Sequence, residues 1–184
     1  MRKWLSPLIL LLVLGSVIFA LFYYKEHVQE HYDKYTKQLD TFFEQDRETH
    51  GFGKYNHQLS FNGNNRHYGI DYRLPVGSKV LAPTDGIVTR LFKDELGGNV
   101  LEIQESNGQY YEWFMHLDSY NVKVGDAVQV GDVIATSGNT GKQTTGPHLH
   151  FQRMNGGIGN RYAEDPKPFV ESLPNGQRSL YQLK

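Results

Sequence analysis

The sequence predicts a mainly β domain, an antiparallel sheet or sandwich, preceded by one transmembrane helix and a short polar helix. Three observations predict this class: an uncharged run near the N-terminus, a polar segment with helical spacing, and short apolar runs separated by glycine-rich turns over the remainder. The expected boundaries are a cytoplasmic tip and anchor at 1–24, a helix or linker at 25–52, and a folded domain at 53–184.

Composition narrows the range of partners. The 184 residues include 19 Lys and Arg against 20 Asp and Glu, a formal net charge of -1. This balance argues against nucleic acid as the main partner, because phosphate binding needs a basic excess. The absence of cysteine rules out a disulfide scaffold, a thiol nucleophile and a cysteine-based metal site. Any metal must therefore be held by His, Asp or Glu.

The N-terminal run is long enough to cross a bilayer. Residues 4–24 carry no charged side chain, and at ~1.5 Å per residue they span about 31 Å as a helix. Arg2 and Lys3 precede the run, so we expect a single-pass protein with a cytoplasmic N-terminus and its folded domain on the extracellular, wall side. A cleaved signal peptide is the alternative, but Ile18-Phe19-Ala20 is a poor cleavage site and favours an uncleaved anchor.

The segment from residue 25 to about 50 predicts a polar helix that ends at Gly51 and Gly53. Its apolar stripe has spacings of 4, 3, 4 and 3 and consists of Val28, Tyr32, Tyr35, Leu39 and Phe42. The helix could be a stalk, a dimer seam or a docked helix, so the oligomeric state stays open. His27 and His31 lie one turn apart, but no third ligand is spaced to join them, which favours two solvated side chains.

Beyond residue 53 the spacing changes to that of strands joined by turns. Strands are expected at 79–82, 87–92, 99–105, 110–117, 124–128, 130–134 and 149–154. Short strands at this spacing indicate an antiparallel arrangement rather than a βαβ fold. The repeated Val-Gly-Asp steps at 124–126 and 130–132 also occur in lipoyl and biotinyl carriers, but Lys142 lacks the hydrophobic flanks that a carrier lysine needs.

The histidines of the strand region carry the chemistry; they are His67, His116, His148 and His150. His67 and Asp71 would lie about 13 Å apart on an ideal strand, so sharing a metal requires a bend, which Gly69 permits. His148 and His150 face the same side of one strand, so one can bind a metal while the other reaches water or substrate. Together these residues predict a hydrolytic zinc site.

The stretch from 66 to 169, which contains these residues, resembles the lysostaphin-type peptidase domain, the M23 family of zinc metalloendopeptidases. The matching motifs are His-Tyr-Gly-Ile-Asp at 67–71, Trp-Phe-Met-His-Leu at 113–117, and Thr-Gly at 140–141 leading to His-Leu-His-Phe at 148–151. Longer runs are similar to membrane-anchored staphylococcal glycyl-glycine endopeptidases. The resemblance implies the antiparallel fold of that domain.

The resemblance also implies roles for five side chains. His67, Asp71 and His150 would hold one Zn²⁺ per chain. His116 and His148 would form the pair that acts on the attacking water and the tetrahedral intermediate; which of them is the general base stays open. The expected activity is hydrolysis of peptidoglycan cross-bridges, preferably at Gly-Gly bonds, in cell-wall remodelling.

Two alternatives remain at this stage: cleavage of D-amino-acid cross-links by the same chemistry, and a non-catalytic wall-binding regulator, which the complete set of five residues disfavours. Gly-Gly selectivity would come from a narrow groove that excludes bulk. Candidate substrate-binding residues are Asn99, Tyr111 and Thr140. One residue departs from the family pattern: Phe61 stands where such enzymes often place a tyrosine whose hydroxyl helps the oxyanion.

Overall fold

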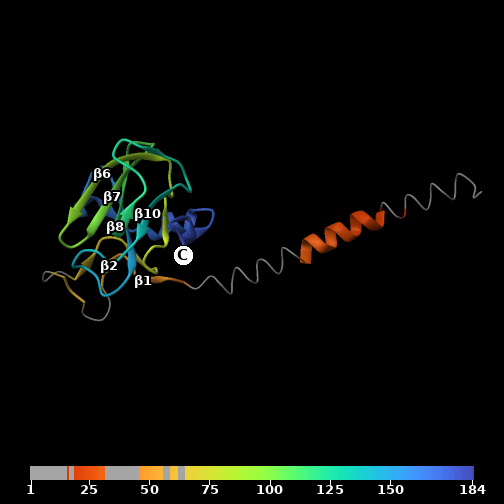
Figure 1. Ribbon diagram of the computed structural model, residues 1–184, viewed down its shortest axis with the longest axis horizontal. Helices are drawn as coiled ribbons and strands as arrows, with labels where there is room; N and C mark the ends of the chain where they lie inside the picture. Colours follow the sequence, from red (N-terminus) through yellow and green to blue (C-terminus); the bar gives the residue numbers. More distant parts are fainter. Residues whose placement is uncertain (1–15, 17–18, 32–45, 56–58, 62–64) are drawn as a thin grey trace, which may run out of the picture. The chain divides into compact units, whose positions relative to one another are not determined.

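The computed structural model divides the chain into two compact units, Met1–Asp46 and Arg47–Lys184. The residues that it describes are 16, 19–31, 46–55, 59–61 and 65–184. Residues 19–31 are helical and exposed (Figure 1). Within these described ranges no helix combines the length and apolarity that a membrane crossing needs. Most of the predicted anchor at 4–24 lies outside them.

The predicted polar helix is found only in part. Residues 25–31 are helical, and the rings of His27 and His31 meet edge to face at 4.7 Å. Within the described part of the chain no third His, Asp or Glu joins them as a metal site. Residues 32–45 lie outside the described set. The expectation of helix as far as residue 50 was wrong, because Glu48–His50 is a strand that pairs with the sheet of the second unit.

The second unit is built on one antiparallel sheet of eleven strands, which confirms the mainly β prediction. The path β1-β4-β11-β8-β10-β5-β13 is joined by β7, β6 and β9 beyond β8 and by β12 beside β11. The strands are β1 (Glu48–His50), β4 (Ile70–Arg73), β5 (Lys79–Leu81), β6 (Gly86–Asp94), β7 (Gly98–Glu105), β8 (Tyr110–Tyr120), β9 (Ala127–Val128), β10 (Val133–Ser137), β11 (His148–Asn155), β12 (Ala163–Glu164) and β13 (Tyr181–Gln182).

Smaller elements complete this unit. A separate two-stranded ribbon pairs β2 (Gly53–Lys54) with β3 (Arg66–His67). The helical elements are α2 (Lys167–Ser172), η1 (Asn160–Tyr162) and η2 (Gly176–Ser179). The Val-Gly-Asp steps at 124–126 and 130–132 belong to turns, and the strands begin after them, at Ala127 and Val133.

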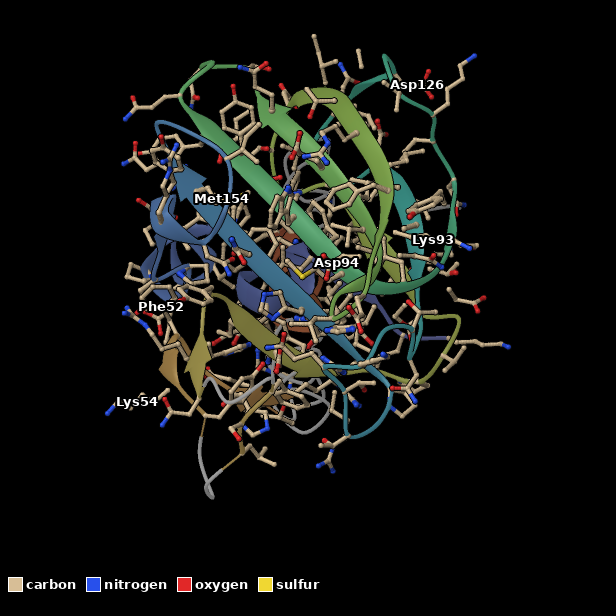
Figure 2. All side chains as sticks on the ribbon, turned by 90° about the vertical axis from the view of Figure 1, so that its left-hand side faces the viewer. Phe52, Lys54, Lys93, Asp94, Asp126 and Met154 are labelled. Carbon is tan, nitrogen blue, oxygen red and sulfur yellow. The ribbon has the colours of Figure 1, made fainter. Side chains whose placement is uncertain are left out.

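The pleat of the sheet separates a core face from a face that carries polar residues. In the β11–β8 pair, Phe151 lies opposite Phe114 and both are fully buried in the core, with ring centroids 5.3 Å apart. The next pair, His150 and Met115, therefore projects from the other face. Figure 2 shows β11 running alongside β8, with Met154 near the far end of the strand. The histidine motif thus emerges on the face opposite the main core.

One buried acid lies on the core side of β8. Glu112 is fully buried; the Thr84 hydroxyl donates a 3.2 Å hydrogen bond to its Oε1, and its Oε2 has no hydrogen-bond partner among the described residues. Burial, and then the nearby Glu105 carboxylate, raise the pKa of Glu112 to about 8, although Thr84 and Arg153 oppose the shift. Glu112 is therefore protonated in the folded state at neutral pH.

This acid should make stability fall as the pH rises. The folded-state pKa of Glu112 lies above the unfolded value near 4.5, so the folded state holds its proton more tightly, and stability declines between about pH 4.5 and about pH 8. Glu112→Gln is expected to remove part of this decline and to stabilise the zinc-loaded protein at pH 8, by an amount on the order of a few kcal/mol. Chemical denaturation at several pH values measures it.

Glu95→Gln is the matched control, because Glu95 is exposed and ion-paired with Lys142 at the surface. It should leave the pH dependence of the unfolding free energy close to that of the unaltered protein. A Glu112→Gln protein whose stability still declined as steeply would show that Glu112 is already ionised in the folded state.

Candidate active site

Three of the predicted residues meet at one point. Asp71 on β4 lies opposite His150 on β11, and His67 at the end of β3 reaches the same place. His67 Nε2 is 3.1 Å from Asp71 Oδ1 and 2.9 Å from His150 Nδ1, while His150 Nδ1 is 2.8 Å from Asp71 Oδ1. All three side chains are buried. The expected bend between His67 and Asp71 is present, since β3 ends at His67 and β4 starts at Ile70.

Gly69 lies in that bend and has a second, steric role. A Cβ at this position would overlap the Phe151 carbonyl oxygen and would lie 2.6 Å from His150 Nε2. Because no side chain fits between the bend and β11, glycine allows the His67 segment to approach His150. Sequence reasoning found the bend but not this contact.

Gly69→Ala is expected to push the bend and the His150 ring apart and to weaken metal binding by about tenfold or more, comparable with losing a residue that orients a ligand. Zinc content after dialysis against a weak chelator measures the effect. Gly146→Ala is the matched control, because a Cβ there meets no atom within 4 Å. Equal zinc retention by both variants would contradict the steric argument.

Backbone carbonyls fix the tautomers of three imidazoles. His67 Nδ1 lies 2.7 Å from the Gly51 carbonyl oxygen, His116 Nδ1 lies 2.7 Å from that of Thr140, and His148 Nδ1 lies 2.8 Å from that of Gly146. A carbonyl oxygen can only accept, so each Nδ1 carries the proton and donates it. Each Nε2 is left with a lone pair for chemistry or for a metal.

A β-bulge places His116 in the site. In the β7–β8 pair, Leu101 lies opposite Phe114 and Asn99 opposite Leu117, so β8 has one more residue than β7 over this stretch. His116 has a φ of 60°, the only positive value among the described non-glycine residues. Bulges redirect side chains near active sites. Here the bulge accompanies an imidazole that lies beside His148, with ring centroids 4.3 Å apart.

The electrostatics of the cluster suit a metal-dependent hydrolase. Burial, followed by the neighbouring His148 and His150, lowers the pKa of His116 to about 3, so that its ring is neutral. Burial also lowers the pKa of His150. For Asp71 burial acts in the opposite sense, but the hydrogen bonds and charges of His150 and His67 outweigh it and hold the pKa of the carboxyl below its ordinary range. Asp71 is therefore an anion at the centre of the cluster.

The donor set fits Zn²⁺. His67, Asp71 and His150 each offer one ligand atom, and these atoms all lie within 4.8 Å of one another. With His67 Nδ1–H bound to Gly51, the Nε2 lone pair of His67 points at the same place as the carboxylate. Converging lone pairs repel unless a cation lies between them. Two imidazoles and one carboxylate form a common zinc set that leaves a position for water.

A tyrosine ring lies beside His67, and it belongs to Tyr55 rather than to position 61. The ring of Tyr55 is buried 4.5 Å from that of His67 and 5.3 Å from that of Phe61, and its hydroxyl accepts a 2.6 Å hydrogen bond from Gln143 Nε2. Burial and the Asp71 charge raise the pKa of Tyr55 above its ordinary value, so the hydroxyl keeps its proton and can donate. Nothing in the local sequence singles out Tyr55 for this place.

The three candidate substrate-binding residues lie in different surroundings. Thr140 Oγ1 accepts from the Asn99 backbone N–H and donates to the Leu117 carbonyl, to which Asn99 Nδ2 also donates. Both side chains therefore hold the start of β7 and the segment around Thr140 against β8, next to His116. Tyr111 shares the face of His150 but lies four residues from Met115, about 13 Å along β8, and its hydroxyl contacts Gln104. Contact of these three with substrate stays a prediction.

A cavity of about 260 Å³ opens beside the cluster. Tyr55 and Phe61 line it together with Asp71 and His148, and the loop at 143–147 supplies several further lining residues. Aromatic rings and this loop together line the cavity, and Gln143 of the loop donates a hydrogen bond to the Tyr55 hydroxyl. The cavity therefore lies where a peptide bond can reach the metal donors and the His116–His148 pair.

Comparison with known proteins now decides the family. Residues 65–163, more than half of the chain, match Peptidase family M23. The chain belongs to family M23. As members of this family are zinc peptidases, the donor set of His67, Asp71 and His150 is assigned to Zn²⁺.

Relatives of this M23 peptidase include two kinds of peptidoglycan enzyme. It is 45% identical over 131 residues to glycyl-glycine endopeptidase ALE-1 of Staphylococcus capitis, covering 71% of this chain and 35% of the relative. It is 37% identical over 115 residues to the peptidoglycan DD-endopeptidase ShyC of Vibrio cholerae, covering 62% and 26%. The chain thus spans about a third or less of the length of these relatives.

Solved structures of other proteins share the fold of this chain. The structure of LytU has a TM-score of 0.71 and 62% identity and covers 77% of this chain and 96% of that one. The catalytic domain of lysostaphin from Staphylococcus simulans has a TM-score of 0.65 and 41% identity and covers 69% and 93%.

Proposed function

We propose that this protein is a zinc metalloendopeptidase that hydrolyses peptidoglycan cross-bridges, preferably at Gly-Gly bonds, in cell-wall remodelling. One observation carries the proposal: three metal donors within 4.8 Å of one another lie beside two further imidazoles, His116 and His148, whose ring centroids are 4.3 Å apart, and His148 lines the cavity. A protein that only binds the cell wall would not need the His116–His148 pair. The similarity to a glycyl-glycine endopeptidase supports the choice of bond.

The chain's own residues then have separate tasks. When bound, zinc supplies the positive charge that acidifies a water and polarises the scissile carbonyl. His67, Asp71 and His150 would hold it. One imidazole of the His116–His148 pair accepts the water proton at Nε2 and passes it to the leaving amine, and the other would stabilise the oxyanion once it carries a proton at Nε2 as well as at Nδ1. Their Nδ1–H groups, bound to carbonyls, keep both rings oriented through the reaction.

The Gly-Gly preference follows from exclusion of bulk. Tyr55 and Phe61, which are in ring contact, line the cavity together with the loop at 143–147, and Gln143 of that loop donates a hydrogen bond to Tyr55. Glycine offers no side chain to recognise, so a narrow passage selects it by admitting nothing larger. The ring of Tyr55 lies 4.5 Å from that of His67, and its hydroxyl would donate a hydrogen bond to a developing negative charge.

Digestion of isolated cell walls tests the bond cleaved. The purified protein should release fragments with new N-terminal glycine from walls that contain glycine cross-bridges and should leave directly cross-linked walls largely intact. Mass analysis of the new termini is the readout. The second candidate, cleavage of a cross-link between D-amino acids, is favoured by the similarity to ShyC. It predicts the reverse pattern, with cleavage of the directly cross-linked walls.

We further propose that the chain is a single-pass membrane protein with the peptidase domain on the wall side. The uncharged run at 4–24 behind Arg2 and Lys3 supports this topology. Protease added to intact protoplasts should remove the domain but leave a membrane-bound N-terminal fragment. Complete protection, or release of the protein into the medium without its first residues, would contradict an uncleaved anchor.

A further inference from the structure

Arg73 occupies a position next to the catalytic cluster that the proposed reaction does not use. It is the last residue of β4 and lies opposite His148 on β11, one pair along from Asp71 and His150. Directly opposed residues of an antiparallel pair project from the same face of a sheet. Arg73 accordingly lines the same cavity as Asp71 and His148.

The guanidinium of Arg73 has no counter-ion within the described ranges of the chain. The side chain is exposed, and no salt bridge or side-chain hydrogen bond joins it to another described residue. Among the described residues that line the cavity, only Asp71 has a carboxylate, and it is engaged by His67 and His150. Glu48, on the neighbouring strand, is paired with Lys167 at 3.0 Å. The cavity therefore presents a positive charge that its own lining does not neutralise.

The backbone of Arg73 is held firmly. Its N–H donates a 2.9 Å hydrogen bond to the Arg47 carbonyl, and its carbonyl accepts one of 3.4 Å from Arg47 Nη1. Pairing with β11 fixes the other edge of β4. The Arg47 guanidinium beside Arg73 is a second positive charge, so it adds to the charge of Arg73 rather than neutralising it. The position is thus a fixed support for a charged side chain that reaches into open space.

We propose that Arg73 binds a carboxylate of the cell-wall peptide close to the scissile bond, so that the enzyme prefers a glycine chain with an anionic flank. This inference rests on the proposed function. The planar guanidinium fork matches a carboxylate in two parallel hydrogen bonds. A run of glycines offers only neutral amides, so the charge must come from a free C-terminus or from an acid attached to the chain.

The reach of Arg73 sets how far away that carboxylate lies. Two residues along β4 place the Arg73 backbone about 7 Å from that of Asp71, and the side chain extends further. Each residue of an extended peptide spans about 3.3–3.6 Å. The carboxylate therefore lies within about three residues of the bond that is cut. Pentaglycine, whose C-terminus is that close to its central bonds, is a suitable probe.

Three synthetic peptides separate the possible sources of charge. Acetyl-pentaglycine amide is neutral, acetyl-pentaglycine has a C-terminal carboxylate, and succinyl-pentaglycine amide has one at the N-terminal side. For the full-length zinc-loaded protein, kcat/KM should favour one of the charged peptides over the neutral one by about three- to tenfold. This range corresponds to a free energy between that of a solvent-exposed ion pair and that of a charge-assisted hydrogen bond.

Substitution of Arg73 should remove the preference. Arg73→Gln is expected to bring the ratio of kcat/KM for charged and neutral peptides close to one. Arg73→Lys is expected to retain part of the preference for the charged peptide, because it keeps the positive charge but lacks the planar guanidinium. Arg161→Gln is the matched control: Arg161 is exposed and stacks on Tyr162 in η1. It should leave the ratio unchanged.

Two results would overturn the assignment: no preference in the unaltered protein, or an equal loss on all three peptides in Arg73→Gln. Calorimetric binding of the same peptides repeats the comparison without turnover. Failure of the unaltered protein to cleave the neutral peptide at a Gly-Gly bond would count against the proposed function, whereas equal binding of charged and neutral peptides by the unaltered protein would count against the role of Arg73. The two failures are therefore distinguishable.

Discussion

Replacing His116 or His148 by alanine is expected to lower kcat by about 10²–10⁴-fold while zinc stays bound. Neither residue is among the three donors, and each is tied through Nδ1 to a backbone carbonyl that leaves Nε2 available to the reaction. Hydrolysis of pentaglycine gives the rate, and metal analysis gives the zinc content of the same preparations.

His27→Ala is the control for these variants, since His27 is exposed on the N-terminal helix and should affect neither quantity. A His116 or His148 variant that kept more than about half of the original rate would remove that residue from the acid–base pair. Loss of zinc together with activity would instead show that the residue helps to hold the metal.

Removing a metal donor should have the other large effect. Asp71→Ala and His150→Ala each delete one of three ligand atoms from a buried site and, for Asp71, also the negative charge that attracts the cation. Zinc affinity should fall by more than about 100-fold, beyond what loss of an orienting neighbour causes. Chelator competition measures affinity, and the unaltered protein should contain about one zinc per chain, as one three-ligand site implies.

Asp118→Ala provides the comparison, because Asp118 is an exposed aspartate on β8 outside the donor cluster. It should keep full zinc content. The assignment of the donors would fail if the Asp71→Ala, His150→Ala double variant still bound zinc as the unaltered protein does.

Much of the fold could be predicted because local patterns carry it. Alternating residues and an Asn-Gly turn mark β7 and β8, which the structure places side by side. The His148–His150 spacing identifies a strand face without reference to any partner. The sheet then brings His67, Asp71 and His150 together, as their residue types suggested.

The rest depends on contacts that no local pattern encodes. The bulge that accompanies His116 in the site involves Met115–His116 and the opposing β7, and the apolar and aromatic residues around it give no sign of it. The capping carbonyls of Gly51, Thr140 and Gly146 are backbone atoms, so residue identity does not reveal them. The polar sequence at 48–50 predicts helix, but these residues form a strand. Pairing with β4, which no local pattern reveals, stabilises it.

The bond between Gly51 and His67 determines where the chain can be shortened. A fragment starting at residue 53, the boundary that the sequence suggested, would lack both β1 and the carbonyl that orients His67. A fragment starting at Arg47 keeps both, because the compact unit begins there. Proteolysis or gene truncation within residues 47–52 would therefore reduce metal loading, although none of the three metal donors is removed.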